Sequence, residues 1–404
     1  MADYIPNPGA TQSRRLRLAI IANSPTPYRT HLHLRIAREL PDLELWSVYT
    51  HERSNAPWSR PVDASTRPVW FGPGESAERQ GEPLRQWHEW RKGGRIIRWL
   101  RQGSIGAVAI SGYNDLGRTR IIRWCRHNGV PCVLFADSNI RGDTATGIKA
   151  WIKGVYVRWV IQNCAGVMPF GSLGRDYFLK YGADPIRIHY FPCEPDYDLI
   201  QALPEEKIMV AREQFDLSPN RRRMVYSGRL VSVKRVDLLI EAFAAIAADR
   251  QDWDLVVLGD GPLKADLQGR IPAHLANRVR WLGFIDDQEV VSAIYRNCDL
   301  LVLPSDYEPW ALVLNEAAAA GMAIVASDAV GAAVELVREG VNGGVFVTGN
   351  VRDLVAKLRL VTDTAQIDRL KRGSSTILAD WRRSADPVEG IRQALQLPGQ
   401  RTDG

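Results

Sequence analysis

The stretch PSDYEPWALVLNEAAAAG, residues 304–321, joins an apolar, strand-like run to a run of small residues. It places two carboxylates, Glu308 and Glu316, eight positions apart in an otherwise apolar segment. Pro309 suits the first position of a helix, so we expect Glu308 on the loop at the end of a strand. Glu316 then lies about two turns into a largely buried helix. A buried carboxylate is costly without hydrogen-bond donors, which a ligand's vicinal hydroxyls or a nearby arginine or amide would supply.

Short β-branched runs alternate with helical patterns on both sides of this stretch. The expected strands are 15–22, 43–50, 107–110, 131–136, 165–170, 186–191, 223–228, 253–259, 278–284, 299–304, 323–327 and 343–347. The expected helices are 28–40, 118–128, 150–162, 172–181, 235–248, 289–297 and the segment after Glu308. This rhythm predicts an α/β fold with mostly parallel sheets covered by helices on both faces. It breaks at the Pro- and acid-rich residues 192–206, which indicates two Rossmann-like domains, 14–195 and 196–375.

The bulk composition is that of a soluble globular protein, with 404 residues, 45% hydrophobic and 24% charged. No apolar run reaches the roughly 18–20 residues of a membrane span, and residues 1–18 lack the apolar core of a secretory signal. The five cysteines lie far apart without a C-x-x-C pair. We therefore expect neither a zinc site nor a disulfide framework, and a reducing cytoplasm as the setting.

Charge is distributed unevenly along the chain. Residues 1–202 hold 27 Lys/Arg against 18 Asp/Glu, whereas residues 203–404 hold 25 against 28. The segment 84–101 combines six Lys/Arg and three Trp with one Glu, as helices at a membrane interface do. We therefore expect peripheral contact with the inner face of an anionic membrane; the alternative is a solvated basic surface over a helix packed on its own sheet. The chain lacks an RNA-type aromatic motif, so nucleic acid is not an expected partner.

The loops at the carboxyl ends of the C-terminal strands carry unusual residues. In SGRLVSVKRVD, residues 227–237, Gly228 permits a tight turn, and Arg229 and Lys234 bring two cations close to a helix N-terminus. That combination suits phosphate oxygens, although a solvated loop is the alternative. No G-x-G-x-x-G or Walker A spacing occurs at LGDGPL, residues 258–263, or at NSPTPYRTH, residues 23–31. This disfavours a nicotinamide dehydrogenase and a P-loop NTPase.

The run PSDYEPWALVLNEAAAAGMAIVASDAVGAAVELVREGVNGGVF, with SGRL…KR, LGDGP and WLGFID before it, resembles the donor site of the retaining GT-B glycosyltransferases of family GT4. The similarity covers most of 220–350 and is weaker over 14–200. It implies two Rossmann-like domains facing across a cleft, with the helices of 376–397 packing back across it. It also implies that Glu316 binds the ribose hydroxyls of a nucleotide sugar and that Glu308 holds hydroxyls of the donor sugar.

The same resemblance assigns the remaining site residues. The diphosphate would be held by a glycine, two cations and the backbone at a helix N-terminus: Gly228, Arg229, Lys234, Ala311 and Leu312. Phe284 and Ile285 would line the base, and the acceptor would lie near Arg29, Asp137 and Ser138. The loop after the first strand reads SPTPYR where many members have two glycines, and Ala311 stands where glycine is usual.

These features predict a retaining glycosyltransferase that moves a sugar from a nucleoside diphosphate to a hydroxyl of a glycan or lipid-linked acceptor. Glu308, Arg229 and Lys234 would be its catalytic residues, and the departing phosphate would take the acceptor's proton. No Asp-x-Asp stands at the carboxyl end of an expected strand, so we expect no metal and no other cofactor. The alternatives are a GT-B nucleotide-sugar epimerase and a non-catalytic basic module that binds membrane or nucleic acid.

Overall fold

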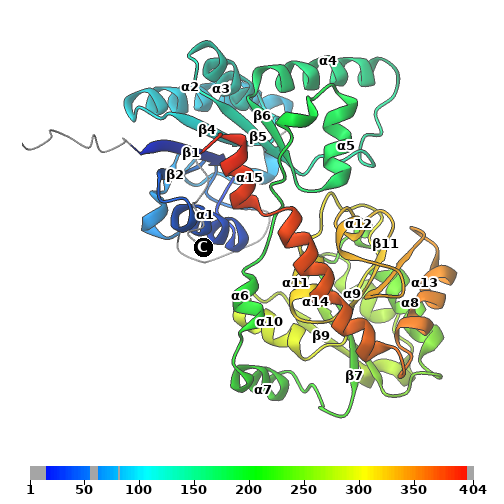
Figure 1. Cartoon of the computed structure of the whole chain (residues 1–404). Helices are drawn as coiled ribbons and strands as arrows, with labels where there is room; N and C mark the ends of the chain where they lie inside the picture. Colours follow the sequence, from blue (N-terminus) through cyan, green and yellow to red (C-terminus); the bar gives the residue numbers. More distant parts are fainter. Residues whose placement is uncertain (1–14, 55–61, 81, 398–404) are drawn as a thin grey trace, which may run out of the picture.

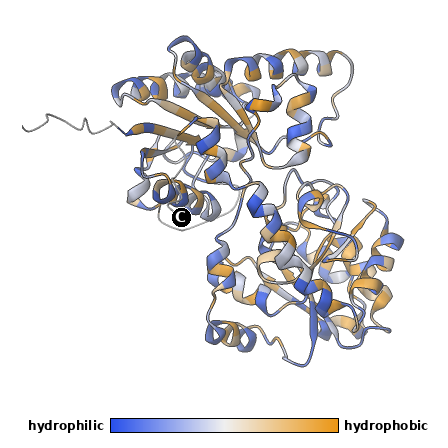
Figure 2. Cartoon of the chain, viewed as in Figure 1, coloured by the Kyte–Doolittle hydropathy of each residue, from blue (hydrophilic) through white to orange (hydrophobic). Residues whose placement is uncertain are grey.

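The computed structural model describes residues 15–54, 62–80 and 82–397, which form two α/β domains (Figure 1). Residues 1–14, on which the prediction about a secretory signal largely rests, lie outside the described residues, as do parts of the polar stretch 51–83. Hydrophobic residues line the strands of both domains (Figure 2). No helix in the described part of the chain is long and apolar enough to cross a membrane.

The N-terminal domain is built on a parallel sheet of six strands in the order β3-β2-β1-β4-β5-β6. The strands are β1 (Leu16–Ala22), β2 (Leu43–Tyr49), β3 (Val69–Trp70), β4 (Ala107–Ser111), β5 (Cys132–Ala136) and β6 (Gly166–Pro169). The helices are α1 (Pro27–Glu39), α2 (Gln86–Gln102), α3 (Leu116–His127), α4 (Gly147–Asn163) and α5 (Ser172–Lys180). One buried cluster lies under α2, α3 and α4, and another under α1 on the opposite face.

The C-terminal domain repeats this topology with the order β12-β11-β10-β7-β8-β9. Its strands are β7 (Arg222–Ser227), β8 (Trp253–Leu258), β9 (Val279–Gly283), β10 (Leu300–Leu303), β11 (Ala323–Ser327) and β12 (Gly343–Phe346). Its helices are α8 (Val236–Ile246), α9 (Lys264–Gly269), α10 (Gln288–Arg296), α11 (Leu312–Ala319), α12 (Ala333–Leu336), α13 (Val351–Val361) and α14 (Ile367–Ser384). In both sheets the strand order reverses at the middle. Open α/β sheets bind ligands at such a point, just beyond the carboxyl ends of the strands.

The chain passes between the domains twice. It first runs through residues 192–196 into α6 (Tyr197–Gln201) and α7 (Glu205–Gln214), and it returns after α14 to α15 (Pro387–Ala394). Helix α14 packs in the C-terminal core, whereas Val388 and Ile391 of α15 belong to the N-terminal core. Arg35 of α1 joins the two crossings, because its guanidinium pairs with Glu194 and lies 2.8 Å from the carboxylate of Asp386.

Two sequence-based predictions of secondary structure are wrong. Residues 186–191 do not form a strand: Asp184 caps a short 3-10 turn at Pro185, and only Ile188 forms a bridge, to Val167 of the edge strand β6. The helix after Glu308 begins at Leu312 rather than at Pro309.

The late start of α11 has a packing reason. The indole of Trp310 is buried between the domains, where its Nε1 donates to the carbonyl of Cys193 at 3.0 Å, and the backbone turns into the helix only after it. Glu316 consequently lies little more than one turn into α11.

Candidate functional site

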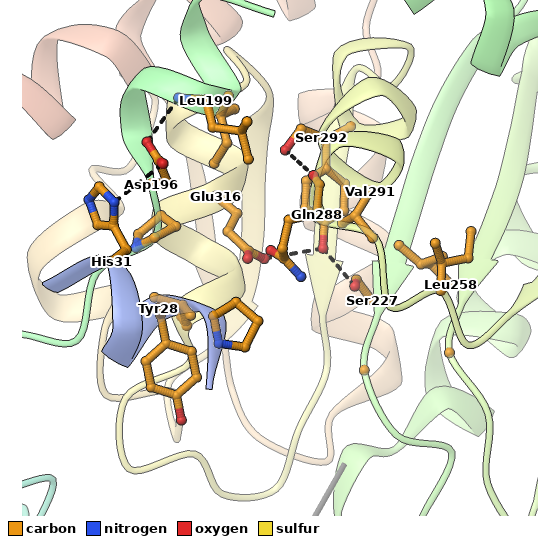
Figure 3. Close-up of a pocket in the computed structure, with 18 of the residues that line it drawn as sticks. Tyr28, His31, Asp196, Leu199, Ser227, Leu258, Gln288, Val291, Ser292 and Glu316 are labelled. Atoms are coloured by element: carbon orange, nitrogen blue, oxygen red, sulfur yellow. Dashed lines mark hydrogen bonds and ion pairs between the residues drawn. The ribbon is translucent and has the colours of Figure 1, made fainter. Parts of the chain in front are cut away.

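A cavity of about 700 Å³ lies between the domains, with walls from both of them and from the linker (Figure 3). Tyr28 and His31 of α1 form the N-terminal wall, and Asp196 of the linker adjoins it. The opposite wall is made by loops at the carboxyl ends of β7, β8 and β9 together with α10 and the start of α11. The cavity therefore lies where the reversal of strand order places a ligand site.

Glu316 points into this cavity from α11 (Figure 3). The hydroxyl of Tyr295 donates to Glu316 Oε2 at 3.3 Å and lies 2.7 Å from Ser227 Oγ. Burial raises the pKa of Glu316 to about 7, and the hydrogen bond from Tyr295 opposes the rise only in part. The carboxylate therefore has spare capacity to accept hydrogen bonds from a ligand, which would stabilise its ionised form.

Two glycines bring the ends of β7 and β8 close together beside the cavity. Gly228 and Gly259 have φ of 153° and 141°, in the region that side chains disfavour. A Cβ on Gly259 would lie 1.9 Å from the carbonyl oxygen of Gly228, so the two backbones touch. Arg229 follows directly, is exposed and lines the cavity, so one cation stands at this strand end.

Glu308 is buried on the loop after β10, as predicted, but it does not line the large cavity. Its Oε1 accepts from Ser305 Oγ at 2.9 Å and forms an ion pair with Lys234. The backbone behind it is braced because Gly331 N donates to the carbonyl of Glu308 at 2.9 Å. The structure thus joins two predicted site residues, Lys234 and Glu308, to each other, and neither of them lines the cavity.

The N-terminus of α11 has an unusual start. Ala311, the residue before the helix, has φ of 81° and ψ of 80°, a left-handed conformation that is strained for alanine. Leu312, the first helical residue, lines the cavity. The positive end of the helix dipole therefore faces the space that Arg229 also borders.

Another part of the cavity wall carries mostly apolar side chains. Phe284 and Ile285, from the loop after β9, line it together with Gln288 and Val291 of α10. Phe284 is exposed to solvent. An aromatic side chain and two branched ones around a single amide suit a planar heterocyclic ring.

The N-terminal residues predicted to be near the acceptor are not part of this cavity. Asp137 and Ser138 border a second, small pocket at the domain junction, where Asn139 donates to the carbonyl of Pro309 at 2.9 Å. Asp137 lies at the edge of this pocket, where desolvation raises the pKa of its carboxyl; a hydrogen bond from its own backbone amide and the charge of Arg29 oppose the rise. The guanidinium of Arg29 donates to the backbone carbonyl of Ser24.

Sequence reasoning missed several residues that shape the cavity. Tyr295 holds Glu316 from the neighbouring helix α10, and no motif marks it. On the other wall, His31 Nδ1 lies 3.3 Å from Asp196 Oδ2, which joins α1 to the linker. His31 follows Pro27 by four positions, so helical spacing could have placed it on the same face.

One cluster in the described part of the chain has the spacing of metal ligands: His51, Glu75 and Glu89. The ammonium of Lys92 lies among them, 2.7 Å from Glu75, 2.9 Å from Glu89 and 3.3 Å from His51. A protein cation thus already pairs with both carboxylates, and neither of them borders the cavity.

Known glycosyltransferases share parts of this sequence and its fold. Residues 209–374 match the model of the glycosyl transferases group 1. The chain is 29% identical over 248 residues to alpha-D-kanosaminyltransferase of Streptomyces kanamyceticus, which is 59% of this chain and 63% of that protein. Sucrose-phosphate synthase from Thermosynechococcus elongatus superposes with a TM-score of 0.72 at 17% identity, covering 95% of this chain and 99% of that one. HepE of Anabaena gives 0.67 at 17% identity, covering 94% and 98%.

The two facing Rossmann-like domains are therefore a GT-B fold, which confirms the fold predicted from the sequence. Residues 209–374, which make up most of the C-terminal domain, are similar to the group 1 glycosyl transferases. The chain spans less than two thirds of the length of the curated relatives that it matches first.

Proposed function

We propose that the chain is a glycosyltransferase that moves a sugar from a nucleoside diphosphate to an acceptor hydroxyl. The observation that carries this proposal is Glu316, a carboxylate of raised pKa that faces the cavity between Arg229 and the apolar wall around Phe284. Ribose hydroxyls would donate to Glu316, the diphosphate would lie at Arg229 and Leu312, and the base would lie on Phe284 and Ile285. The match of residues 209–374 to the group 1 glycosyl transferases supports the assignment.

The nature of the donor draws support from proteins of the same fold. HepE has been crystallised with UDP, with UDP and glucose, and with UDP-glucose. A relative from Corynebacterium glutamicum is named a GDP-mannose-dependent alpha-mannosyltransferase. We therefore propose a nucleoside-diphosphate sugar and assign neither the base nor the sugar.

The proposed chemistry retains the anomeric configuration and needs no side-chain nucleophile. The bond from C1 to the β-phosphate oxygen breaks while the acceptor oxygen bonds to C1 on the same face, and the acceptor proton passes to the departing phosphate. Arg229 and the N-terminus of α11 would stabilise the charge on that phosphate. Lys234 would add a second cation once the donor competes with Glu308 for it, and Glu308 would then hold hydroxyls of the transferred sugar.

The acceptor in this proposal is a glycan or a lipid-linked sugar. Asp137 and Ser138 border the small pocket at the domain junction, and Arg29 interacts electrostatically with Asp137; all three would be reached by the acceptor rather than by the nucleotide. Peripheral contact with an anionic membrane is part of the same proposal, since a lipid-linked acceptor would be met at a bilayer.

Transfer should proceed without a divalent metal, because Arg229, Lys234 and the α11 N-terminus supply fixed positive charge. The test is sugar transfer from a panel of UDP-, GDP- and ADP-sugars to added glycan acceptors in excess EDTA. We expect product with one nucleotide class and no gain from Mn²⁺ or Mg²⁺. Donor isomerised without transfer would indicate an epimerase, and thermal stability unaffected by any nucleotide would indicate a binding module. Activity abolished by EDTA and restored by metal would contradict the electrostatic account.

A further inference from the structure

Helix α4 is apolar on the face that points away from its own domain. Val157 and Val160 are buried in the N-terminal core, as the inner face of a surface helix should be. On the outer face Ile148 is 78% exposed, Trp151 67%, Ile152 56% and Val155 47%. This i, i+3, i+4, i+7 spacing makes one continuous stripe, here called the α4 stripe. A helix with apolar residues on both its inner and its outer face is normally covered on both sides, so the α4 stripe indicates a missing partner.

The surface around the α4 stripe is basic. Helices α2, α3 and α4 lie side by side over one face of the sheet (Figure 1). Residues 86–163, all of which the structure describes, contain 13 Lys/Arg and four Asp/Glu. Exposed basic side chains stand on α3 and α4: Arg123, Arg126, Lys149 and Arg158.

The four acidic residues do not offset this charge on the helical face. Glu89 and Asp115 are buried. Asp143 accepts from Lys153 at 2.7 Å and from Lys180 at 2.6 Å. Asp137 lies instead at the domain junction. The helical face therefore presents apolar and positive groups with no exposed carboxylate among these four.

Helix α2, whose sequence predicts contact with a membrane, buries much of its apolar surface inside the protein. Gly93 packs so closely on α3 that a Cβ would lie 2.7 Å from the carbonyl oxygen of Gly117. Trp99 packs edge-on against Trp46, and Trp90 lies under the guanidinium of Arg120. Most of 84–101 is thus packed on its own domain, although Leu84 and Trp87 at its start are exposed; the longer uncovered apolar stripe belongs to α4.

The α4 stripe is close in the chain to the acceptor side of the domain junction. Residues 137–146 connect the end of β5 to the first turn of α4. Asp143 pins this loop to α4 and α5 through Lys153 and Lys180, and Asn139 fixes its start to Pro309 of the other domain. Anything that binds α4 therefore also fixes the position of Asp137 and Ser138 relative to itself.

We propose that the α4 stripe docks on an anionic lipid bilayer, with the arginines of α3 against the headgroups. Tryptophan beside aliphatic and basic side chains is the composition of a helix lying in the interface. A second copy of the chain is a poorer occupant, because a two-fold interface would bring one basic face against another. If the proposed function holds, the acceptor is one that is presented at the bilayer surface. The docking itself does not depend on that function.

The test is flotation with phosphatidylcholine vesicles, with and without phosphatidylglycerol. We expect the wild-type chain to float only with the anionic vesicles. Trp151→Ser combined with Ile152→Ser should weaken vesicle binding at least about tenfold. Arg123→Gln and Arg126→Gln should weaken it about fivefold each at low salt, an effect that high salt removes. Met209→Ser combined with Val210→Ser changes residues of similar exposure on α7 and should leave binding unchanged.

Folding and donor binding are measured on the same variants. Unchanged thermal midpoints and unchanged nucleotide-sugar affinity are expected, since the α4 stripe is exposed and distant from Glu316 in the fold. The docking proposal is overturned if the wild-type chain ignores anionic vesicles, or if the Trp151/Ile152 variant binds them equally well. It is also overturned if light scattering shows a dimer that this variant dissociates. If the wild-type chain binds no nucleotide sugar, the proposed function is contradicted instead.

Discussion

The two domains have the same strand order but use different surfaces. In the C-terminal domain the polar groups gather at the carboxyl ends of the strands, where Gly228, Arg229 and Glu316 meet at one cavity. In the N-terminal domain the loops after β5 and β6 contact the other domain, as Asn139 and Ser172 do, and the distinctive surface lies on the outer helices α2, α3 and α4. The comparison teaches that topology sets where a site can form, while loops and helix faces decide what it does.

The largest effect that this comparison predicts follows from removing Arg229, the cation at the cavity of the C-terminal domain. Arg229→Ala should lower kcat/KM about 10²-fold or more, because a fixed charge at the leaving phosphate is lost. Steady-state kinetics with the active donor measures it. Arg270→Ala is the matched control, since Arg270 is exposed on the same domain and pairs with Asp266 away from the cavity. A loss of less than threefold for Arg229→Ala, similar to that of the control, would remove Arg229 from the site.

Nucleotide-sugar affinity should depend on pH through Glu316, whose pKa burial raises to about 7. Ribose hydroxyls donate to the ionised carboxylate, so binding must expel the proton that the free protein holds below that pH. Affinity should therefore fall as pH decreases through 7, by up to about tenfold per pH unit, and calorimetry in two buffers should detect proton release. A nucleotide sugar serves as ligand because its diphosphate diester does not titrate there. A flat wild-type profile, equal to that of Glu316→Gln, would contradict this role.

The same pKa shift has an opposite consequence for folding. The native state holds a proton on Glu316 more tightly than the unfolded chain does, since the pKa is raised from 4.5. Stability from this group is therefore present at low pH and is lost as pH rises between those two values. The site residue thus works against the stability of the unliganded C-terminal domain at neutral pH.

The smallest predicted effect concerns the backbone before α11. Ala311→Gly should raise the free energy of unfolding by about 1 kcal/mol, because glycine relieves the left-handed strain at a modest cost in unfolded-state entropy. Denaturant titration measures it. Ala265→Gly, at an exposed position in α9, should lower stability by about the same amount. Equal signs for both substitutions would show that Ala311 is not strained.

Much of the fold could be predicted because strand and helix signals are local. The run 253–259 is apolar and β-branched, and it becomes β8 within one residue of the expected bounds. The failures depend on contacts distant in sequence. Residues 186–191 have strand-like composition, but they begin in a 3-10 turn and then contact only the edge strand β6, through one bridge and two backbone hydrogen bonds. The start of α11 depends on Trp310 being held between the domains, which no local pattern reports.

Site residues that belong to a sequence motif could be predicted, whereas residues that reach the site only through tertiary packing could not. Glu316, Arg229 and Phe284 stand in recognisable segments, and the structure brings all three to one cavity. Tyr295 belongs to another helix, and only the tertiary packing of α10 against α11 reveals its contact with Glu316. Asp137 was placed by a weaker likeness, and it lies at the junction rather than at the cavity. The roles proposed for all these residues await the measurements above.

The most direct test of the central claim is calorimetric titration of the active nucleotide sugar into the wild-type chain, Glu316→Ala and Glu308→Ala. Losing a charge-assisted hydrogen bond to a buried group costs about 1.5–3 kcal/mol, roughly 10- to 150-fold in affinity. We predict a loss of this size for Glu316→Ala, larger than the loss for Glu308→Ala, with Glu316→Gln as the isosteric control. Unchanged affinity in Glu316→Ala would contradict the assignment of this cavity as the nucleotide-sugar site.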